Sequence, residues 1–145
     1  MQQDEQAAEG LEPSLVGRAS PPRPVRVEPE AVRRFARALG DPRADDPGWV
    51  PPTFPIRFGI WESGIPGLQL DLRRVLHGEQ AFRYARPLRP GEELEVRSRV
   101  ADVRRRKGSQ GSLTLLDLEM LGVDAEGREV FAARTTLVVR EGVGG

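Results

Sequence analysis

The segment 76–96, LHGEQAFRYARPLRPGEELEV, contains His77, the only histidine of the chain. Imidazole titrates near neutral pH, so a histidine at the mouth of a strand can serve as a general base toward a substrate that enters over the sheet edge. The alternative is structural, with His77 packed and hydrogen-bonded to backbone beside Gly78 at the start of that strand. A single histidine without a positioned partner does not decide between the two interpretations.

Two further features also allow a chemical and a structural interpretation. Asp41 stands between Gly40 and Pro42 at the predicted end of a helix, where it either presents a carboxylate to a substrate or makes an Asx turn. The one dense basic run, RRRK at 104–107, either binds the phosphates of a nucleotide-like carrier or forms a solvated strand end near a hairpin turn.

Composition excludes several classes of function. The absence of cysteine excludes disulfides, thiolate nucleophiles and cysteine-ligated metal sites, and one histidine leaves little for any other metal. The 22 basic residues balance the 22 acidic ones, and aromatic residues make up 6% of the chain, which argues against nucleic-acid partners. No phosphate-binding loop or serine-hydrolase elbow occurs, and we expect no cofactor. The polar first ten residues and the lack of a long apolar run predict a cytoplasmic protein without membrane contact.

The N-terminal third is expected to contain a mobile arm, a helix and a buried segment. Residues 1–23 are polar and rich in Pro and Gly, which predicts the mobile arm. Pro29 and Gly40 bracket a segment in which Val32, Phe35, Ala36 and Leu39 have helical spacing. The apolar residues of segment 49–67 fit both helical spacing and strand alternation, and Thr53 as an N-cap with Pro55 behind it favours a short helix, either buried or part of an interface.

The rest of the chain is predicted to form strands. Four segments alternate between apolar and polar residues and end at turn signals: 79–85, 93–106, 112–123 and 128–140. A change of phase predicts a bulge or bend near Val100. The pattern indicates a single α+β domain over residues 24–140, with a curved antiparallel sheet wrapped around the short helix, followed by a mobile tail at 141–145.

Five segments together resemble a known family. They are FARALGDP, VPPTFP, LHGEQAFRYARPLRPGEEL, GSQGSLTLLDLEM and GREVFAARTTLVVR, within residues 25–140. They are similar to the N-terminal half of MaoC-like dehydratases, which includes the FAS1-like dehydratase domains and the non-catalytic subunits of (R)-hydroxyacyl dehydratases of fatty acid metabolism. The resemblance implies a hot-dog fold, in which an antiparallel sheet wraps a long helix.

The resemblance also implies a partner and a substrate. A second hot-dog unit, in a homodimer or a heterodimer, would extend the sheet into one continuous sheet. The substrate would be an acyl thioester of coenzyme A or acyl carrier protein, with its acyl chain in a tunnel at the pair interface. The residues expected to line or support that tunnel are Phe54, Phe58, Trp61, Gly78 and Phe82.

The catalytic motif of the family is incomplete in this chain. Catalytic members carry an Asp and, five residues later, a His in a G-D-x-N-P-x-H motif. This chain has Gly40 and Asp41, but Asp46 stands in place of the His. The resemblance therefore implies a subunit of an (R)-3-hydroxyacyl thioester dehydratase or enoyl-CoA hydratase that shapes the pocket, while a partner supplies the Asp-His dyad. The alternatives are a homodimeric acyl-CoA-binding module without turnover, and a thioesterase that uses Asp41 or Glu79.

Overall fold

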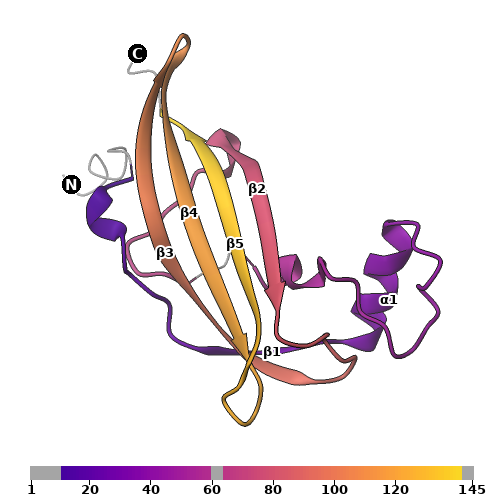
Figure 1. Cartoon of the computed structure of the whole chain (residues 1–145). Helices are drawn as coiled ribbons and strands as arrows, with labels where there is room; N and C mark the ends of the chain where they lie inside the picture. Colours follow the sequence, from indigo (N-terminus) through magenta and orange to yellow (C-terminus); the bar gives the residue numbers. More distant parts are fainter. Residues whose placement is uncertain (1–10, 60–63, 142–145) are drawn as a thin grey trace, which may run out of the picture.

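The computed structural model describes residues 11–59 and 64–141. Its centre is one antiparallel sheet of five strands in the order β1-β3-β4-β5-β2 (Figure 1). The strands are β1 (Arg23–Arg26), β2 (Val75–Tyr84), β3 (Glu93–Gly108), β4 (Gly111–Val123) and β5 (Glu129–Arg140). The described residues also form the helix α1 (Pro29–Ala38) and the short 3-10 helices η2 (Pro13–Leu15), η3 (Phe54–Phe58) and η4 (Leu72–Arg74). The predicted α+β class with a curved antiparallel sheet is confirmed.

The long strands agree closely with the sequence pattern, but β2 does not. β3 and β4 form a hairpin that closes at Gly108 and Gly111, and their register shifts between Val100 and Asp102, which confirms the predicted bulge. β2 begins at Val75, four residues before the predicted start. His77 therefore lies within the strand rather than at its mouth. The segment lacks an apolar-polar alternation, which is why the pattern did not mark it.

The sheet has one covered face and one open face. On the covered face, the inward side chains of the three central strands, including Val96, Leu116 and Leu137, are fully buried. The open face carries charged residues at the alternate positions, among them Arg99 and Arg134. This division follows from the two-residue period of a strand, because successive side chains point to opposite faces.

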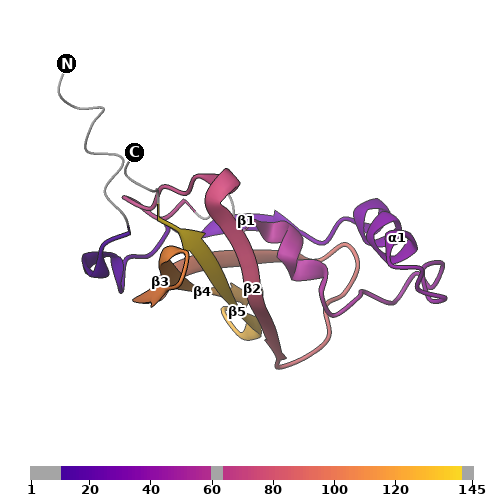
Figure 2. The same cartoon turned by 90° about the horizontal axis from the view of Figure 1, so that it is seen from above.

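A series of aromatic rings connects α1 to the sheet through η3. Phe35 of α1 meets Phe54 edge-on, with ring centroids 5.5 Å apart, and Phe58 lies 6.1 Å from Phe131 of β5. Figure 2 shows η3 between α1 and the sheet. The expected short buried helix is thus a 3-10 helix, and its predicted cap, Thr53, makes no side-chain capping hydrogen bond.

The N-terminal segment differs from the mobile arm that the sequence predicts over residues 1–23. Leu15 is 6% exposed and belongs to a core cluster with Val100. The Oγ of Ser20 accepts a 2.9 Å hydrogen bond from the backbone N–H of Ser98, and β1 pairs with β3. From residue 11 onward the segment therefore belongs to the packed domain, because its backbone pairing and apolar burial offset the entropy of ordering it. Residues 1–10 and 142–145, parts of the expected arm and tail, lie outside the described residues.

Candidate functional site

A bulge in β2 places His77 and Gln80 on the same face of the sheet. Three residues apart in a regular strand, they would point to opposite faces. The pairing with β5 shifts between His77 and Glu79, so that His77 lies opposite Leu137 and Gln80 opposite Thr135, both on the covered face. Gly78 suits this position, because a Cβ there would lie 3.2 Å from the carbonyl oxygen of Thr136.

A short chain of hydrogen bonds leads from the buried sheet to the exposed imidazole. Thr135, which is buried in β5, donates from its Oγ1 to the Gln80 Oε1 at 2.6 Å. The same Oε1 lies 3.1 Å from the Nε2 of His77. His77 itself is exposed on β2, the last strand of the sheet. The side chain is therefore held by specific contacts and not by packing in the core.

Asp41 and Asp46 are both engaged in turns. Asp41 accepts a 2.8 Å hydrogen bond from the backbone N–H of Arg43. Its carboxylate also forms an ion pair with the guanidinium of Arg43. That backbone hydrogen bond, together with the nearby charge of Arg43, lowers the pKa of Asp41. Asp46 accepts from the backbone N–H of Gly48 at 2.9 Å. These contacts agree with the Asx-turn interpretation, and a catalytic role for Asp41 stays a prediction.

The predicted pocket residues occupy different environments. Phe54 and Phe58 are 1% and 7% exposed and support the core. Phe82 is half-buried on the covered face of β2, with its ring centroid 6.5 Å from that of Tyr84. The Tyr84 hydroxyl donates to the carbonyl oxygen of Pro52, and burial raises the pKa of Tyr84. Trp61 lies outside the described residues, and a role for any of these side chains in binding acyl chains stays a prediction.

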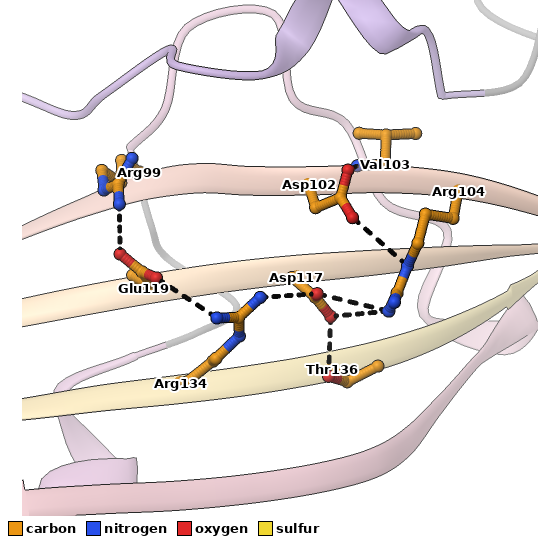
Figure 3. Close-up of polar contacts among 8 residues, drawn as sticks. All are labelled: Arg99, Asp102, Val103, Arg104, Asp117, Glu119, Arg134 and Thr136. Atoms are coloured by element: carbon orange, nitrogen blue, oxygen red, sulfur yellow. Dashed lines mark hydrogen bonds and ion pairs between the residues drawn. The ribbon is translucent and has the colours of Figure 1, made fainter.

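A second polar cluster, on the open face, escaped the sequence reasoning (Figure 3). At its centre is Asp117 of β4, which is only 2% exposed. Its carboxylate accepts from the Thr136 Oγ1 at 2.7 Å and from the guanidinium of Arg134 at 3.0 Å, and it also contacts Arg104. Burial would raise the pKa of Asp117, but the hydrogen bonds and the positive charges outweigh it, so the pKa is lowered. A carboxylate so saturated with donors is suited to stabilising the sheet rather than to accepting a proton.

The ion pairs on the open face extend outward from Asp117, because Glu119 bridges Arg99 of β3 and Arg134 of β5. On the other face of the sheet, Arg105 lies opposite Thr114 and pairs with Glu141 at 3.2 Å. Arg104 and Arg105 of the basic run are thus engaged within the chain. The sequence signal that could have indicated this cluster is the segment TLLDLEM, in which Asp117 and Glu119 place two acidic side chains on one face of an otherwise apolar strand.

Neither a metal site nor a membrane-spanning helix is found in the part of the chain that the structure describes. Residues 11–59 and 64–141 contain no group of three or more His, Cys, Asp or Glu side chains that could hold a metal ion. No helix in these two ranges is both long and apolar enough to cross a bilayer.

Comparison with known sequences identifies close relatives of the domain. A family model described as the FAS1-like dehydratase domain region matches residues 14–133. A UPF0336 protein of Streptomyces coelicolor is 37% identical over 147 residues, which covers 90% of this chain and 95% of that protein. A UPF0336 protein of Thermobifida fusca is 35% identical over 135 residues, which covers 82% of this chain and 86% of that protein. The matches thus include the N-terminal segment and most of the sheet.

Solved structures with the same architecture include MaoC-like dehydratases and a chain of a 3R-hydroxyacyl-ACP dehydratase complex. A chain of the HadBC (3R-hydroxyacyl-ACP dehydratase) complex from Mycobacterium tuberculosis superposes with a TM-score of 0.65 at 22% identity, covering 88% of this chain and 99% of that one. A chain of the ChsH1-ChsH2 complex from the same organism superposes with a TM-score of 0.63 at 18% identity. The superposition covers 88% of this chain and 86% of that one. A MaoC-like dehydratase superposes with a TM-score of 0.66 at 26% identity. The superposition covers 88% of this chain but only 42% of that longer chain. These likenesses confirm the hot-dog fold.

Proposed function

This chain belongs to the FAS1-like dehydratase domain family and to the UPF0336 proteins, and from that membership we propose that it is one subunit of a two-subunit hot-dog hydro-lyase. The enzyme would interconvert (R)-3-hydroxyacyl and trans-2-enoyl thioesters carried on coenzyme A or acyl carrier protein. This chain would shape the acyl pocket, and a second hot-dog protein would supply the catalytic Asp and His.

The observation that carries this proposal is the environment of the incomplete motif. Asp41 is held in a turn by Arg43, and Asp46, at the position of the family histidine, is held in a turn by Gly48. Reversible hydration needs a base, an acid and a donor to the thioester oxygen, and two carboxylates engaged in turns supply none of these readily. In this proposal a second chain would supply the missing dyad, while this chain would supply apolar walls and backbone N–H groups.

The two edges of the sheet favour β2 as the strand that meets the partner. The edge strand β1 has four residues and includes Pro24, two features that discourage further pairing. β2 has ten residues, contains no proline and presents Leu76 with 55% of its surface exposed. A ten-residue edge strand with an exposed large apolar side chain is suited to being covered by another chain.

Hydration of a short trans-2-enoyl-CoA, followed by the loss of enoyl absorbance, tests the proposal. The assay uses this chain alone, a candidate hot-dog partner with an intact Asp-x-x-x-x-His motif alone, and the mixture of both. We expect the mixture to exceed the sum of its components. Robust turnover by this chain alone, abolished by His77→Ala, would show instead that the chain carries its own chemistry.

An acyl-thioester-binding module is the second candidate, because both carboxylates of the motif are engaged in turns and β2 can pair with its own copy. In that case the purified homodimer would bind an acyl-CoA saturably, and no hot-dog partner would elicit turnover. The same purified samples distinguish the two functions, since binding and hydration are measured on one preparation.

A further inference from the structure

The contacts of Gln80 determine which ring nitrogen of His77 carries the hydrogen. The Gln80 Oε1 faces Thr135 and His77, while the Gln80 Nε2 lies 3.5 Å from the carbonyl oxygen of Ala81. An amide oxygen accepts hydrogen bonds and cannot donate them. With the amide in this orientation, the Nε2 of His77 carries the hydrogen, and in the neutral imidazole the Nδ1 is left with its lone pair.

That lone pair belongs to an exposed side chain on the free edge of the sheet. No residue in the described part of the chain donates a hydrogen bond to the Nδ1. The bulge at Gly78 is what directs the ring to the covered face, alongside Gln80. An imidazole oriented through one nitrogen and open at the other is the arrangement by which proteins present a neutral acceptor.

We propose that the Nδ1 of His77 accepts a hydrogen bond from the 3-hydroxyl group of a 3-hydroxyacyl thioester bound where β2 meets the second hot-dog unit. This inference rests on the proposed function. The thioester carbonyl only accepts hydrogen bonds, whereas the 3-hydroxyl group donates, and the saturated acyl thioester of the same length lacks it. Gln80 and Thr135 are positioning residues that hold the imidazole in the required tautomer.

The tautomer is measurable without any partner or activity, because the chain has one histidine. In the 15N-labelled chain, the ring nitrogen shifts should report a single neutral tautomer with its hydrogen on Nε2. Gln80→Leu keeps the size of the side chain but removes the acceptor, and we expect the ring to return to the mixture of tautomers seen in free histidine. A wild-type ring with its hydrogen on Nδ1, or an unchanged spectrum in Gln80→Leu, would overturn the orientation.

The ligand contact is tested by a ratio of two affinities. The chain is purified with a hot-dog partner whose dyad histidine is replaced by alanine, so that the hydroxyacyl thioester is not consumed. Binding of (R)-3-hydroxyhexanoyl-CoA and of hexanoyl-CoA is then measured by calorimetry. We expect the wild-type complex to prefer the hydroxyacyl ligand by about fivefold to tenfold, as one uncharged hydrogen bond provides.

Two conservative variants distinguish the contribution of the Nδ1 from that of the Nε2. His77→Asn can place an oxygen near the position of the Nδ1 and should retain part of the preference. His77→Gln can reach the position of the Nε2 but leaves no acceptor at the Nδ1, and it should abolish the preference while hexanoyl-CoA still binds. Equal loss of both ligands in His77→Gln, or a preference that persists in it, would overturn the hydroxyl contact alone. Binding of neither ligand by the wild-type complex would overturn the proposed function, and this inference with it.

Discussion

At the scale of single residues, the structure gives its two polar clusters opposite characters. Around Asp117 both carboxylate oxygens accept from donors on Thr136, Arg134 and Arg104, so the charge is fixed and serves the sheet. Around His77 one nitrogen is anchored by Gln80 and the other has no donor among the described residues. A saturated buried ion stabilises a fold, whereas an oriented and exposed acceptor is suited to bind.

Asp117→Asn should lower the free energy of unfolding by about 2 kcal/mol near neutral pH, because the two arginines lose their charged acceptor. The folded-state pKa of Asp117 lies below its ordinary value of 3.8. The stabilisation is therefore fully present above that value and is lost as the pH falls through the lower folded pKa. Urea unfolding of wild type and variant at about pH 7 and about pH 3 should show the difference shrink at the lower pH.

The control for this variant is Glu119→Gln, which changes the same kind of group nearer the solvent. Its partner Arg99 is half-exposed, so we expect a loss of about 0.5 kcal/mol. Equal effects of the two variants, or a difference at Asp117 that does not depend on pH, would contradict the central role of the buried carboxylate.

Gly78→Ala should disturb the bulge in β2. The added Cβ would meet the backbone oxygen of Thr136 and the Cγ2 of Val138, both at 3.2 Å, and backbone atoms yield little. We expect the variant to lose about 2 kcal/mol of stability in thermal or urea unfolding. Gly108→Ala is the matched control, because its Cβ would have no atom nearer than 3.4 Å, and it should stay within about 0.5 kcal/mol of wild type.

At the scale of elements, the parts that could be predicted are those that local pattern determines. Alternation located β3, β4 and β5 to within two residues, and the phase change located the bulge after Val100. β1 was missed because RPVR carries a proline and two arginines, and only its pairing with β3 makes it a strand. The Asp117 cluster was missed for a related reason, since long-range strand pairing brings Thr136 and Arg104 to the carboxylate.

The N-terminal segment provides the prediction that belongs to this scale. Leu15→Ala should cost about 3 kcal/mol, because its side chain is buried against the sheet with Val100. Val16→Ala, at a neighbouring side chain that is 46% exposed, should cost less than about 0.5 kcal/mol. Denaturant unfolding of the two variants distinguishes a packed segment from a mobile arm, for which both substitutions would be silent.

At the scale of the whole molecule, the two faces of the sheet are covered more fully than its β2 edge. The core is closed by η3, α1 and the N-terminal segment on one face, and by the ion pairs of Figure 3 on the other. What is left open is β2, with His77 on one face and Leu76 on the other. This edge is where the proposed second hot-dog unit would bind.

Leu76→Asp should weaken that pairing without unfolding the chain, because it places a charge on a surface that loses its water on association. We expect the dissociation constant between this chain and the second hot-dog unit to rise by at least about tenfold, as measured by analytical ultracentrifugation. Leu121→Asp is the control, since Leu121 is also exposed on the open face, at 42%, but lies on β4 in the middle of the sheet. Equal weakening by both variants would place the interface on the open face instead of the edge.

The unequal edges of the sheet have a consequence for stoichiometry. The proposed pairing would extend the sheet at β2, whereas the four residues and Pro24 of β1 disfavour strand addition at the other edge. When two such chains join through β2, both extendable edges are used and only blunt ends remain. Growth by strand addition then stops at two units, so the arrangement that invites one partner also protects the protein from polymerising into fibres.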